Sequence, residues 1–488
     1  MTDGMAMERL GDLAGSALLR DRAYVNGAWV GGDPADVTDP FTGEAIGRVP
    51  LLDASAVQAA IEGAEAAFPA WSRRPNRERG ALLRGWLALI ERDRERLARL
   101  ITLENGKPLR EARGEIAYGA GFIEYYAEEA RRIQGEVIPA DVAGRRLTAE
   151  REPIGVCFAI TPWNFPMAML ARKIAPALAA GCTIVCKPAM QTPLSALALA
   201  ALAEEAGIPP GVLNVVTGEA AMIGGLATRS PVVRKISFTG STGVGALLMQ
   251  QSAPTIKRLS LELGGNAPLL VFDDADPDVA IETAMVAKFR NGGQSCIAAN
   301  RIYVQRGILP AFTAALRERI AGLTLGDGLD EATDQGPLID ARATAKVDEH
   351  IGDAVRGGGQ LLVGGASTAP RMAAPTLVAN VARDALMTRE ETFGPLAALI
   401  AFDSYDEGIA MANDTPFGLA AYVCSRDPQR IARATRDVES GMVGINTGLI
   451  STASAPFGGV KQSGLGREGS HHGIAEYLNL KYVCHAGL

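Results

Sequence analysis

Short apolar stretches alternate with helical stretches along the middle of the chain. Between residues 153 and 262 the apolar runs predict strands, and the longer runs between them predict helices. The strands are predicted at 154–160, 183–186, 212–216, 236–238 and 257–263, and the helices at 166–180, at 194–206, after Gly218 and at 242–250. Because each crossover helix must pack back onto the sheet, this alternation predicts a parallel sheet with helices on both faces.

A second alternation of the same kind follows from residue 267 to about 440. Its predicted strands lie at 269–272, 301–304 and 396–400, with helices between them. The chain has 488 residues, which is too long for a single core. We therefore expect an α/β protein with two doubly wound, Rossmann-like domains and an active site in the cleft between them.

The segments that flank the two alternations predict smaller features. The Asn26-Gly27 pair between two β-rich runs is typical of a hairpin, and long amphipathic helices follow from 53 to 132. Residues 135–152 indicate an excursion from the first domain, and residues 477–483 predict a strand. We expect that strand to complete a sheet with the excursion, within the chain or from another subunit, so that no edge stays open.

Composition and charge exclude several classes of partner. The 48 Lys and Arg residues and the 55 Asp and Glu residues give a formal net charge of -7, without a long block of like charge. We therefore expect no nucleic acid as a partner. The longest apolar stretch, at 174–186, is too short for a membrane span and contains Pro176 and Gly181. The N-terminus mixes acidic and basic residues, so we expect neither a secretory signal nor a membrane partner.

The six cysteines and four histidines are scattered without the spacing of a disulfide framework or a metal site. We expect no metal ion, and a reducing, cytoplasmic location. His471-His472 is interpreted as a solvated polar turn.

Two polar loops carry the candidate chemistry. Cys296 ends a loop of small and polar residues that begins at Asn291, a setting that suits a nucleophilic thiol. From this loop alone an inert, buried thiol is the alternative, and the nearby Glu262 motif favours the nucleophile. Glu262 ends an alternating strand just before two glycines, where ligands gather in α/β folds. The turn at 238–245 leaves a strand and opens a helix, which suits an anion such as pyrophosphate. Its glycine spacing differs from the dinucleotide fingerprint, so a purely structural turn is the alternative.

Seven motifs together resemble the NAD(P)-dependent aldehyde dehydrogenase superfamily over nearly the whole chain. They are Thr-Pro-Trp-Asn-Phe-Pro at 161–166, Lys-Pro-Ala at 187–189, Phe-Thr-Gly-Ser at 238–241, Glu-Leu-Gly-Gly at 262–265, Gly-Gln-Ser-Cys at 293–296, Glu-Thr-Phe-Gly-Pro at 391–395 and Pro-Phe-Gly-Gly at 456–459. The resemblance implies a cofactor-binding domain at 1–131 and 153–262, a catalytic domain at 263–465, and a small β oligomerisation arm at 132–152 and 466–488. The arm implies a homo-oligomer, either a dimer or a tetramer.

The resemblance also implies the catalytic roles. Cys296 adds to the aldehyde carbon, and the Asn164 side chain with the Cys296 backbone N–H stabilises the oxyanion. Glu262 then deprotonates the water that hydrolyses the thioester, and it also helps to deprotonate the thiol. The alternative for Asn164 is a helix cap before Phe165.

Cofactor contacts follow from the same resemblance. They are Trp163, Lys187, Gly240 and Ser241 for the adenosine and phosphates, Leu263 for the nicotinamide, and Glu391 and Phe393 for the nicotinamide ribose. Met190 stands where NAD-preferring relatives often carry a glutamate that repels a 2′-phosphate. We therefore expect NADP to be tolerated alongside NAD, with a preference for NADP as a further hypothesis.

The substrate segments resemble those of succinate-semialdehyde dehydrogenases. Arg172 and Arg290 match the two arginines that clamp the distal carboxylate of an aldehyde there, and Ser451 adds a hydroxyl. The alternatives are a salt bridge for each arginine, and glutarate semialdehyde, 2-oxoglutarate semialdehyde or a broad range of aldehydes as substrate. Glu262 disfavours an enzyme that acylates CoA or phosphate, and the intact catalytic residues disfavour a silent binding protein. Ala298 replaces a second cysteine found in many relatives, so that this chain lacks their regulatory disulfide.

Overall fold

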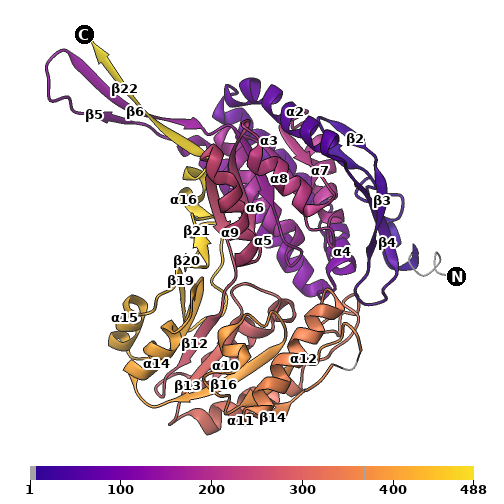
Figure 1. The fold of residues 1–488 in the computed structure, drawn as a ribbon, viewed down its shortest axis with the longest axis vertical. Coiled ribbons are helices and arrows are strands. Elements are labelled where there is room, and N and C mark those ends of the chain that lie inside the picture. Colours follow the sequence, from indigo (N-terminus) through magenta and orange to yellow (C-terminus); the bar gives the residue numbers. More distant parts are fainter. Residues whose placement is uncertain (1–6, 368, 488) are drawn as a thin grey trace.

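The structure is a computed structural model that describes residues 7–367 and 369–487. Two sheets form its centre and lie one above the other along the long axis (Figure 1). In order across the first sheet, the strands are β2 (Ala28–Val30), β1 (Ala23–Val25), β9 (Leu213–Val215), β8 (Thr183–Lys187), β7 (Val156–Ile160), β10 (Val233–Thr239), β11 (Arg258–Glu262) and β21 (Gly464–Leu465).

The strands from β9 to β11 run parallel, and short antiparallel strands close both edges of the first sheet. The chain adds β8 and β9 on one side of β7, and β10 and β11 on the other. The direction of winding therefore reverses between β7 and β10, and their carboxyl ends flank the crevice where such sheets bind ligands.

Helices cover both faces of this sheet, as the sequence predicts. Cys157 and Ala159 of β7 belong to one apolar cluster, whereas Val156 and Phe158 belong to another on the opposite face. The first cluster includes α3 (Asn76–Arg92), α4 (Arg94–Asn105), α5 (Leu109–Glu129), α6 (Pro166–Ala180) and α7 (Leu194–Glu205). The second includes α2 (Ala54–Ser72), α8 (Ala220–Arg229) and α9 (Thr242–Ser252). The alternation along β7 is the two-residue period of a strand that is buried on both faces.

The second sheet is also doubly wound. Its order is β14 (Gln360–Val363), β15 (Thr376–Ala379), β16 (Leu396–Phe402), β13 (Ala299–Gln305), β12 (Ala267–Val271), β18 (Ala420–Cys424) and β19 (Met442–Ile445), and only β14 is antiparallel. One face packs on α10 (Pro277–Phe289) and α11 (Leu309–Ala321), and the other on α12 (Ala341–Arg356), α13 (Leu386–Arg389), α14 (Tyr405–Asn413) and α15 (Pro428–Asp437). The remaining short elements are η1 (Gly11–Leu13), η2 (Ala130–Arg132), η3 (Ala253–Thr255), η4 (Arg290–Gly293) and α16 (Ser470–Ala475).

Three antiparallel features lie outside the two sheets. The first is a ribbon of β3 (Asp33–Thr38) and β4 (Ala45–Leu51), and the second is a small pair of β17 (Phe417–Gly418) and β20 (Val460–Lys461). The third is an arm of β5 (Glu136–Ile138), β6 (Arg145–Pro153) and β22 (Leu478–Ala486), which projects from the body towards the C-terminus (Figure 1). The predicted tail strand therefore pairs with the 135–152 excursion of its own chain.

The structure places residues 464 and 465 with a different sheet from the one that the sequence predicts. The sequence places them at the end of the second domain, but β21 pairs with β11 of the first sheet. Gly464 makes the close approach possible, because a Cβ there would lie 1.8 Å from the Leu261 carbonyl oxygen, and because its φ is +121°. The chain thus returns to the first sheet before the arm begins.

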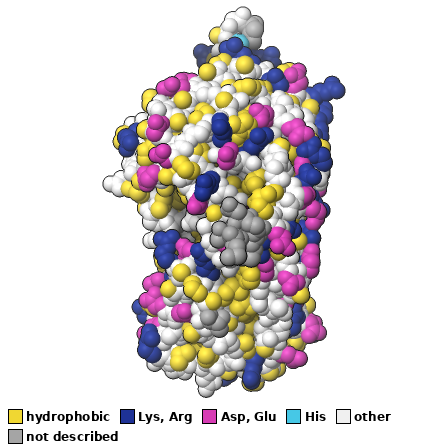
Figure 2. Space-filling model, turned by 90° about the vertical axis from the view of Figure 1, so that its right-hand side faces the viewer, with side chains coloured by type: hydrophobic (Ala, Val, Ile, Leu, Met, Phe, Trp, Pro, Cys, Tyr) yellow, Lys and Arg dark blue, Asp and Glu magenta, His cyan; other side chains and the backbone are white. Residues whose placement is uncertain are grey.

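The surface carries both signs of charge. Figure 2 shows one face on which Lys and Arg side chains lie among Asp and Glu side chains, without a large area of a single sign. This agrees with the even spread of charge along the sequence.

The predicted hairpin supplies a test of the fold. Asn26 and Gly27 have φ values of 53° and 79°, as the favoured two-residue turn requires. We expect Gly27→Ala to lower the free energy of unfolding by about 1–2 kcal/mol, because alanine is strained at positive φ. Its Cβ would also lie 2.7 Å from Pro210 Cβ. Urea denaturation measures the change.

Gly31→Ala is the matched control, because an added Cβ there meets no atom within 4 Å. Equal urea midpoints for the two variants would contradict a strained turn at Gly27.

Candidate active site

Several predicted site residues line one narrow cavity. Its walls contain Asn164, Arg172, Arg290, Cys296 and Ser451, together with Tyr118, Phe165, Met169, Ser295, Ile297 and Phe457. Tyr118, Arg290 and Ser451 also line a wider cavity of about 430 Å³ beside it. The residues come from α5, from the β7–α6 loop, from α6, from the loop before β13 and from the segment after β19. We infer that the wider cavity is the approach to Cys296.

Close backbone contacts fix the loop that carries Cys296. Asn291, Gly292 and Gly293 have φ values of 53°, 61° and 72°, so the chain turns through three left-handed residues before the cysteine. A Cβ on Gly265 would lie 2.2 Å from the Cys296 carbonyl oxygen. The glycine that follows the Glu262 strand is therefore needed for the two candidate loops to touch.

The Cys296 thiol needs a base to become a nucleophile. Burial raises the pKa of this thiol to about 12. The positive charge of Arg172 opposes the shift, whereas the carboxyl groups of Glu391 and Glu262 add to it. Because the thiolate is the reactive form, a proton acceptor must lie nearby.

Glu262 is the candidate for that acceptor. It ends β11 and is 1% exposed, and its Oε2 has no hydrogen-bond partner among the described residues. Burial, and next the negative charge of Glu468, hold the pKa of Glu262 well above its usual range, although Arg172 and Lys173 oppose them. A carboxyl group with a raised pKa beside a thiol can take up and release protons near neutral pH.

Hydrogen bonds orient the side chain of Asn164. Its Nδ2 donates to the Gln294 carbonyl at 3.1 Å, and its Oδ1 accepts from the Phe165 N–H at 3.1 Å. The first turn of α6 is capped instead by Glu115, which accepts from the N–H groups of Met167 and Ala168 at 2.9 and 3.2 Å. The helix-cap alternative for Asn164 is therefore wrong, and its second amide hydrogen is available for another acceptor.

The two candidate substrate arginines have different surroundings. Arg172 is 1% exposed and forms an ion pair with Glu468, which also pairs with Lys173. Burial alone would raise the pKa of Glu468, but Arg172 and Lys173 outweigh burial and lower it. Arg172 is therefore engaged in a buried salt bridge, and its contact with a substrate carboxylate stays a prediction.

Arg290 makes no hydrogen bond or ion pair in the part of the chain that the structure describes. Its guanidinium carbon lies 5.1 Å from the centre of the Phe165 ring. Ser451 Oγ, which borders the same cavity, shares a hydrogen bond with the Tyr118 hydroxyl. Arg290 is therefore the cation of this cavity that is available to an anionic ligand.

The candidate cofactor residues meet across the two sheets. Trp163, Lys187, Met190, Gly240, Ser241 and Leu263 follow or end the strands β7, β8, β10 and β11. Glu391 and Phe393 precede β16 of the second sheet. The Trp163 and Phe393 ring centres are 5.4 Å apart, and Glu391 Oε1 accepts from the Gly265 N–H at 3.4 Å. Burial raises the pKa of Glu391 to about 8.

Neither Lys187, which ends β8, nor Met190, three residues later, brings a negative charge to this edge of the first sheet. Lys187 is 4% exposed, and its Nζ donates to the Pro188 carbonyl at 3.1 Å. Burial lowers the pKa of Lys187 to about 8, so this ammonium group would gain from an anionic or hydroxyl partner. Met190 is half-buried and brings no carboxylate. Ser241 caps α9 by accepting the Val244 N–H at 3.4 Å.

Several site residues were not predicted from the sequence. Phe457 lies in a recognised motif, and the Arg172 guanidinium carbon stacks on its ring at 4.2 Å. Asn291 begins the polar loop that ends at Cys296. Tyr118 and Glu468 carry no motif that signals a role, because each reaches the site only through the packing of α5 and the segment after β21.

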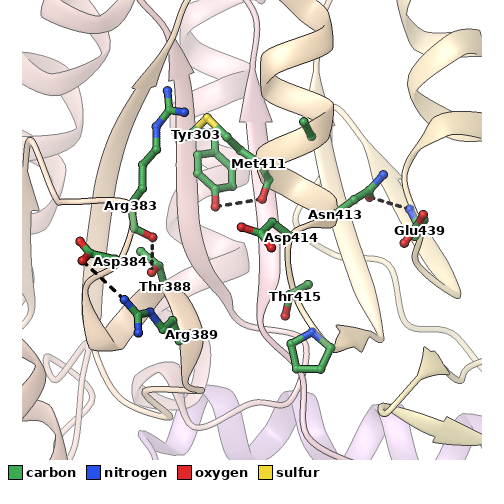
Figure 3. Close-up of a pocket in the computed structure, with 12 residues that line it drawn as sticks. Tyr303, Arg383, Asp384, Thr388, Arg389, Met411, Asn413, Asp414, Thr415 and Glu439 are labelled. Atoms are coloured by element: carbon green, nitrogen blue, oxygen red, sulfur yellow. Dashed lines mark hydrogen bonds and ion pairs between the residues drawn. The ribbon is translucent and has the colours of Figure 1, made fainter.

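A larger cavity lies in the second-sheet half of the molecule (Figure 3). Its volume is about 1160 Å³, and none of its lining residues is a predicted site residue. Its charges are largely paired, since Arg389 meets Asp384 at 3.5 Å, and Arg383 and Glu439 pair with Glu407 and Lys461. Because Cys296 and Asn164 line the smaller cavity, that cavity is the candidate active site.

Neither a metal site nor a membrane-spanning helix occurs among residues 7–367 and 369–487. No group of three or more His, Cys, Asp or Glu side chains is arranged to hold a metal ion. No described helix has both the length and the apolar character of a membrane span.

Comparison with known proteins identifies the family. The model of the aldehyde dehydrogenase family matches residues 29–483. A glutarate-semialdehyde dehydrogenase of Pseudomonas putida is 54% identical over 475 residues, which cover 97% of this chain and 99% of the relative. The NADP+ succinate-semialdehyde dehydrogenase of Escherichia coli is 53% identical over 474 residues, 96% of this chain and 98% of the relative.

The fold is shared as well. The crystal structure of succinate-semialdehyde dehydrogenase from Burkholderia pseudomallei is similar with a TM-score of 0.95 and 53% identity, covering 96% of this chain and 98% of that one. This chain belongs to the aldehyde dehydrogenase family and is an NAD(P)-dependent oxidoreductase of aldehydes.

Proposed function

We propose that this aldehyde dehydrogenase oxidises a short aldehyde with a distal carboxylate, and that succinate semialdehyde is its first candidate substrate. The observation that carries the proposal is Arg290, a cation without an anionic partner among the described residues, in the same narrow cavity as Cys296. A planar guanidinium binds a carboxylate through paired, charge-assisted hydrogen bonds. Ser451 and Tyr118 supply hydroxyl groups beside it. Glutarate semialdehyde is the second candidate, since a relative of comparable identity is named for it.

The proposed chemistry begins at Cys296. Glu262 accepts the thiol proton, the sulfur forms a bond to the aldehyde carbon, and the carbonyl electron pair moves to the oxygen. The Asn164 amide and the Cys296 backbone N–H donate to this oxyanion. When bound, the nicotinamide is the hydride acceptor that the oxidation requires. Glu262 next releases the thiol proton to solvent, so that it is a carboxylate again. It then accepts a proton from the water that attacks the thioester. The C–S bond breaks, the carboxylic acid leaves, and Cys296 remains as the thiolate.

The cofactor is proposed to be NADP as well as NAD. Met190 contributes no negative charge beside the adenosine ribose, and the buried Lys187 favours an anion. We further propose that residues 1–131 and 153–262 bind the cofactor and that the enzyme is cytoplasmic. The proposed catalytic domain, expected at 263–465, ends at residue 463, because β21 pairs with the first sheet.

A homo-oligomer is proposed from the exposed apolar side chains. On α9, Val244, Leu247 and Met249 are 44%, 48% and 44% exposed, and on the arm Leu480 and Tyr482 are 62% and 61% exposed. Exposed apolar groups on a helix and on an edge strand are typical of subunit interfaces.

Substrate selectivity tests the role of Arg290. We expect kcat/KM for succinate semialdehyde to exceed that for butanal by about 100-fold, which corresponds to roughly 2.7 kcal/mol of transition-state binding. Arg290→Gln should remove most of this ratio, because the amide cannot replace the charge. Glutarate semialdehyde, measured in parallel, fixes the preferred chain length.

Arg110→Gln is the control for charge alone. Arg110 lines the wider cavity and pairs with Asp334 at 3.2 Å, so its loss should change the ratio by less than about 3-fold. Similar losses for both aldehydes in Arg290→Gln would exclude a carboxylate-binding role for this residue.

Cofactor preference tests the role of Met190. Wild-type enzyme should use NADP, and Met190→Glu should lower kcat/KM for NADP about 10-fold or more relative to NAD, because a carboxylate repels the 2′-phosphate. Met190→Gln has the same shape without the charge and should change the ratio much less. The proposal fails if the wild type is inactive with NADP, or if Met190→Glu leaves the ratio unchanged.

Light scattering coupled to size exclusion tests the interface. Leu247→Glu on α9 should shift the oligomer to a smaller species, because a buried, unpaired carboxylate opposes association. Val355→Glu on α12, where the native side chain is 43% exposed, should leave the mass unchanged. A monomeric wild type would disprove the proposed oligomer.

A further inference from the structure

One asparagine joins the loop of Cys296 to the loop of Asn164. Asn291 Nδ2 donates to the Asn164 carbonyl at 2.8 Å and to the Gln294 carbonyl at 3.2 Å. The Gln294 carbonyl also accepts from Asn164 Nδ2 at 3.1 Å. The amides of Asn291 and Asn164 therefore share one acceptor, two residues before the nucleophile.

The orientation of the Asn291 side chain is determined by these contacts. A reversed amide would place its oxygen against two carbonyl oxygens, so only Nδ2 can face them. Asn291 is 1% exposed, and its Oδ1 has no hydrogen-bond partner among the described residues. Its φ of 53° is unusual for a residue other than glycine. A strained residue with a buried, unpartnered oxygen is retained where its remaining contacts matter.

Further bonds hold both sides of this junction. The Asn291 N–H donates to Glu111 Oε2 at 2.6 Å, which ties the nucleophile loop to α5. The Asn164 carbonyl also accepts from Lys107 Nζ at 2.7 Å, and Lys107 pairs with Glu115 at 2.6 Å. The backbone of Asn291 is thus held by Glu111, while its side chain holds the Asn164 carbonyl.

We infer that Asn291 is a positioning residue of the oxyanion hole. It acts through Asn164, whose amide it holds in register with the Cys296 backbone N–H, and it touches neither substrate nor cofactor. The inference rests on the proposed role of Asn164 in stabilising the oxyanion. An oxyanion hole works because its donors are fixed before the charge develops, so a loosened Asn164 should slow the reaction more than it weakens binding.

Asn291→Gly is the sharpest test, because glycine keeps the left-handed backbone and removes only the side chain. We expect kcat to fall by about 10- to 100-fold, with the dissociation constant of NADP, measured by fluorescence quenching, within about 3-fold of wild type. Asn291→Asp, which also tolerates positive φ, turns an acceptor towards the two carbonyls and should lose at least as much.

A double-mutant cycle separates positioning from general damage. If Asn291 acts through Asn164, then Asn291→Gly should cost less than about 3-fold in an Asn164→Ala background. Asn380→Gly is the matched control, because Asn380 also has a φ of 53° but is exposed at the end of β15. It should keep wild-type kcat.

The assays use any aldehyde that the wild type oxidises, so their outcome does not depend on the proposed substrate. If the wild type does not oxidise carboxylated aldehydes, the proposed function is overturned, but the positioning role of Asn291 is not. Wild-type kcat in Asn291→Gly, or an equal loss in both backgrounds, would overturn the positioning role. If Asn291→Gly does not fold, the cycle is made with Asn291→Asp and judged by the same criterion.

Discussion

The site depends most on the two ion pairs formed by the buried carboxylate of Glu468. Glu468 pairs with Arg172 and Lys173 of α6, and none of the three is more than 5% exposed at its side chain. Removing the Glu468 carboxylate would leave two buried cations without this counter-charge, at a cost of about 3–5 kcal/mol. The same residue exchanges two backbone hydrogen bonds with Phe457. The pairing therefore locks the segment around Phe457 and Gly458 against Arg172 and Glu262.

The site combines side chains that are carried by both sheets. Glu262 ends a strand of the first sheet, and Cys296 lies just before a strand of the second. Neither sheet contains a complete site. The Gly265 contact with Cys296, and the Trp163 contact with Phe393, show that the two halves meet at the carboxyl ends of the first sheet. The reversal of winding between β7 and β10 opens the crevice there.

The same arrangement separates the tasks of the two arginines. Arg172 is held by Glu468 and opposes the rise in the pKa of Cys296, so its charge already serves the reaction centre. Arg290 lies between the narrow and the wide cavity and keeps its charge for a ligand. Under the proposed function, an aldehyde with a distal carboxylate would place its carbonyl carbon at Cys296 and its carboxylate at Arg290.

The sequence by itself determined the alternation of strands and helices, the hairpin at Asn26-Gly27 and the pairing of the tail strand with the 135–152 excursion. It also pointed to Cys296 and Glu262 as candidate site residues, whose catalytic roles stay predictions. These rest on local signals: hydrophobic period, turn chemistry and short motifs. Only the tertiary structure decided three other features. They are the ion pair of Arg172 with Glu468, the helix cap supplied by Glu115 and the pairing of Gly464 with the first sheet. Charge pairing and capping depend on which distant side chains share a buried, water-poor space, and no local pattern specifies that.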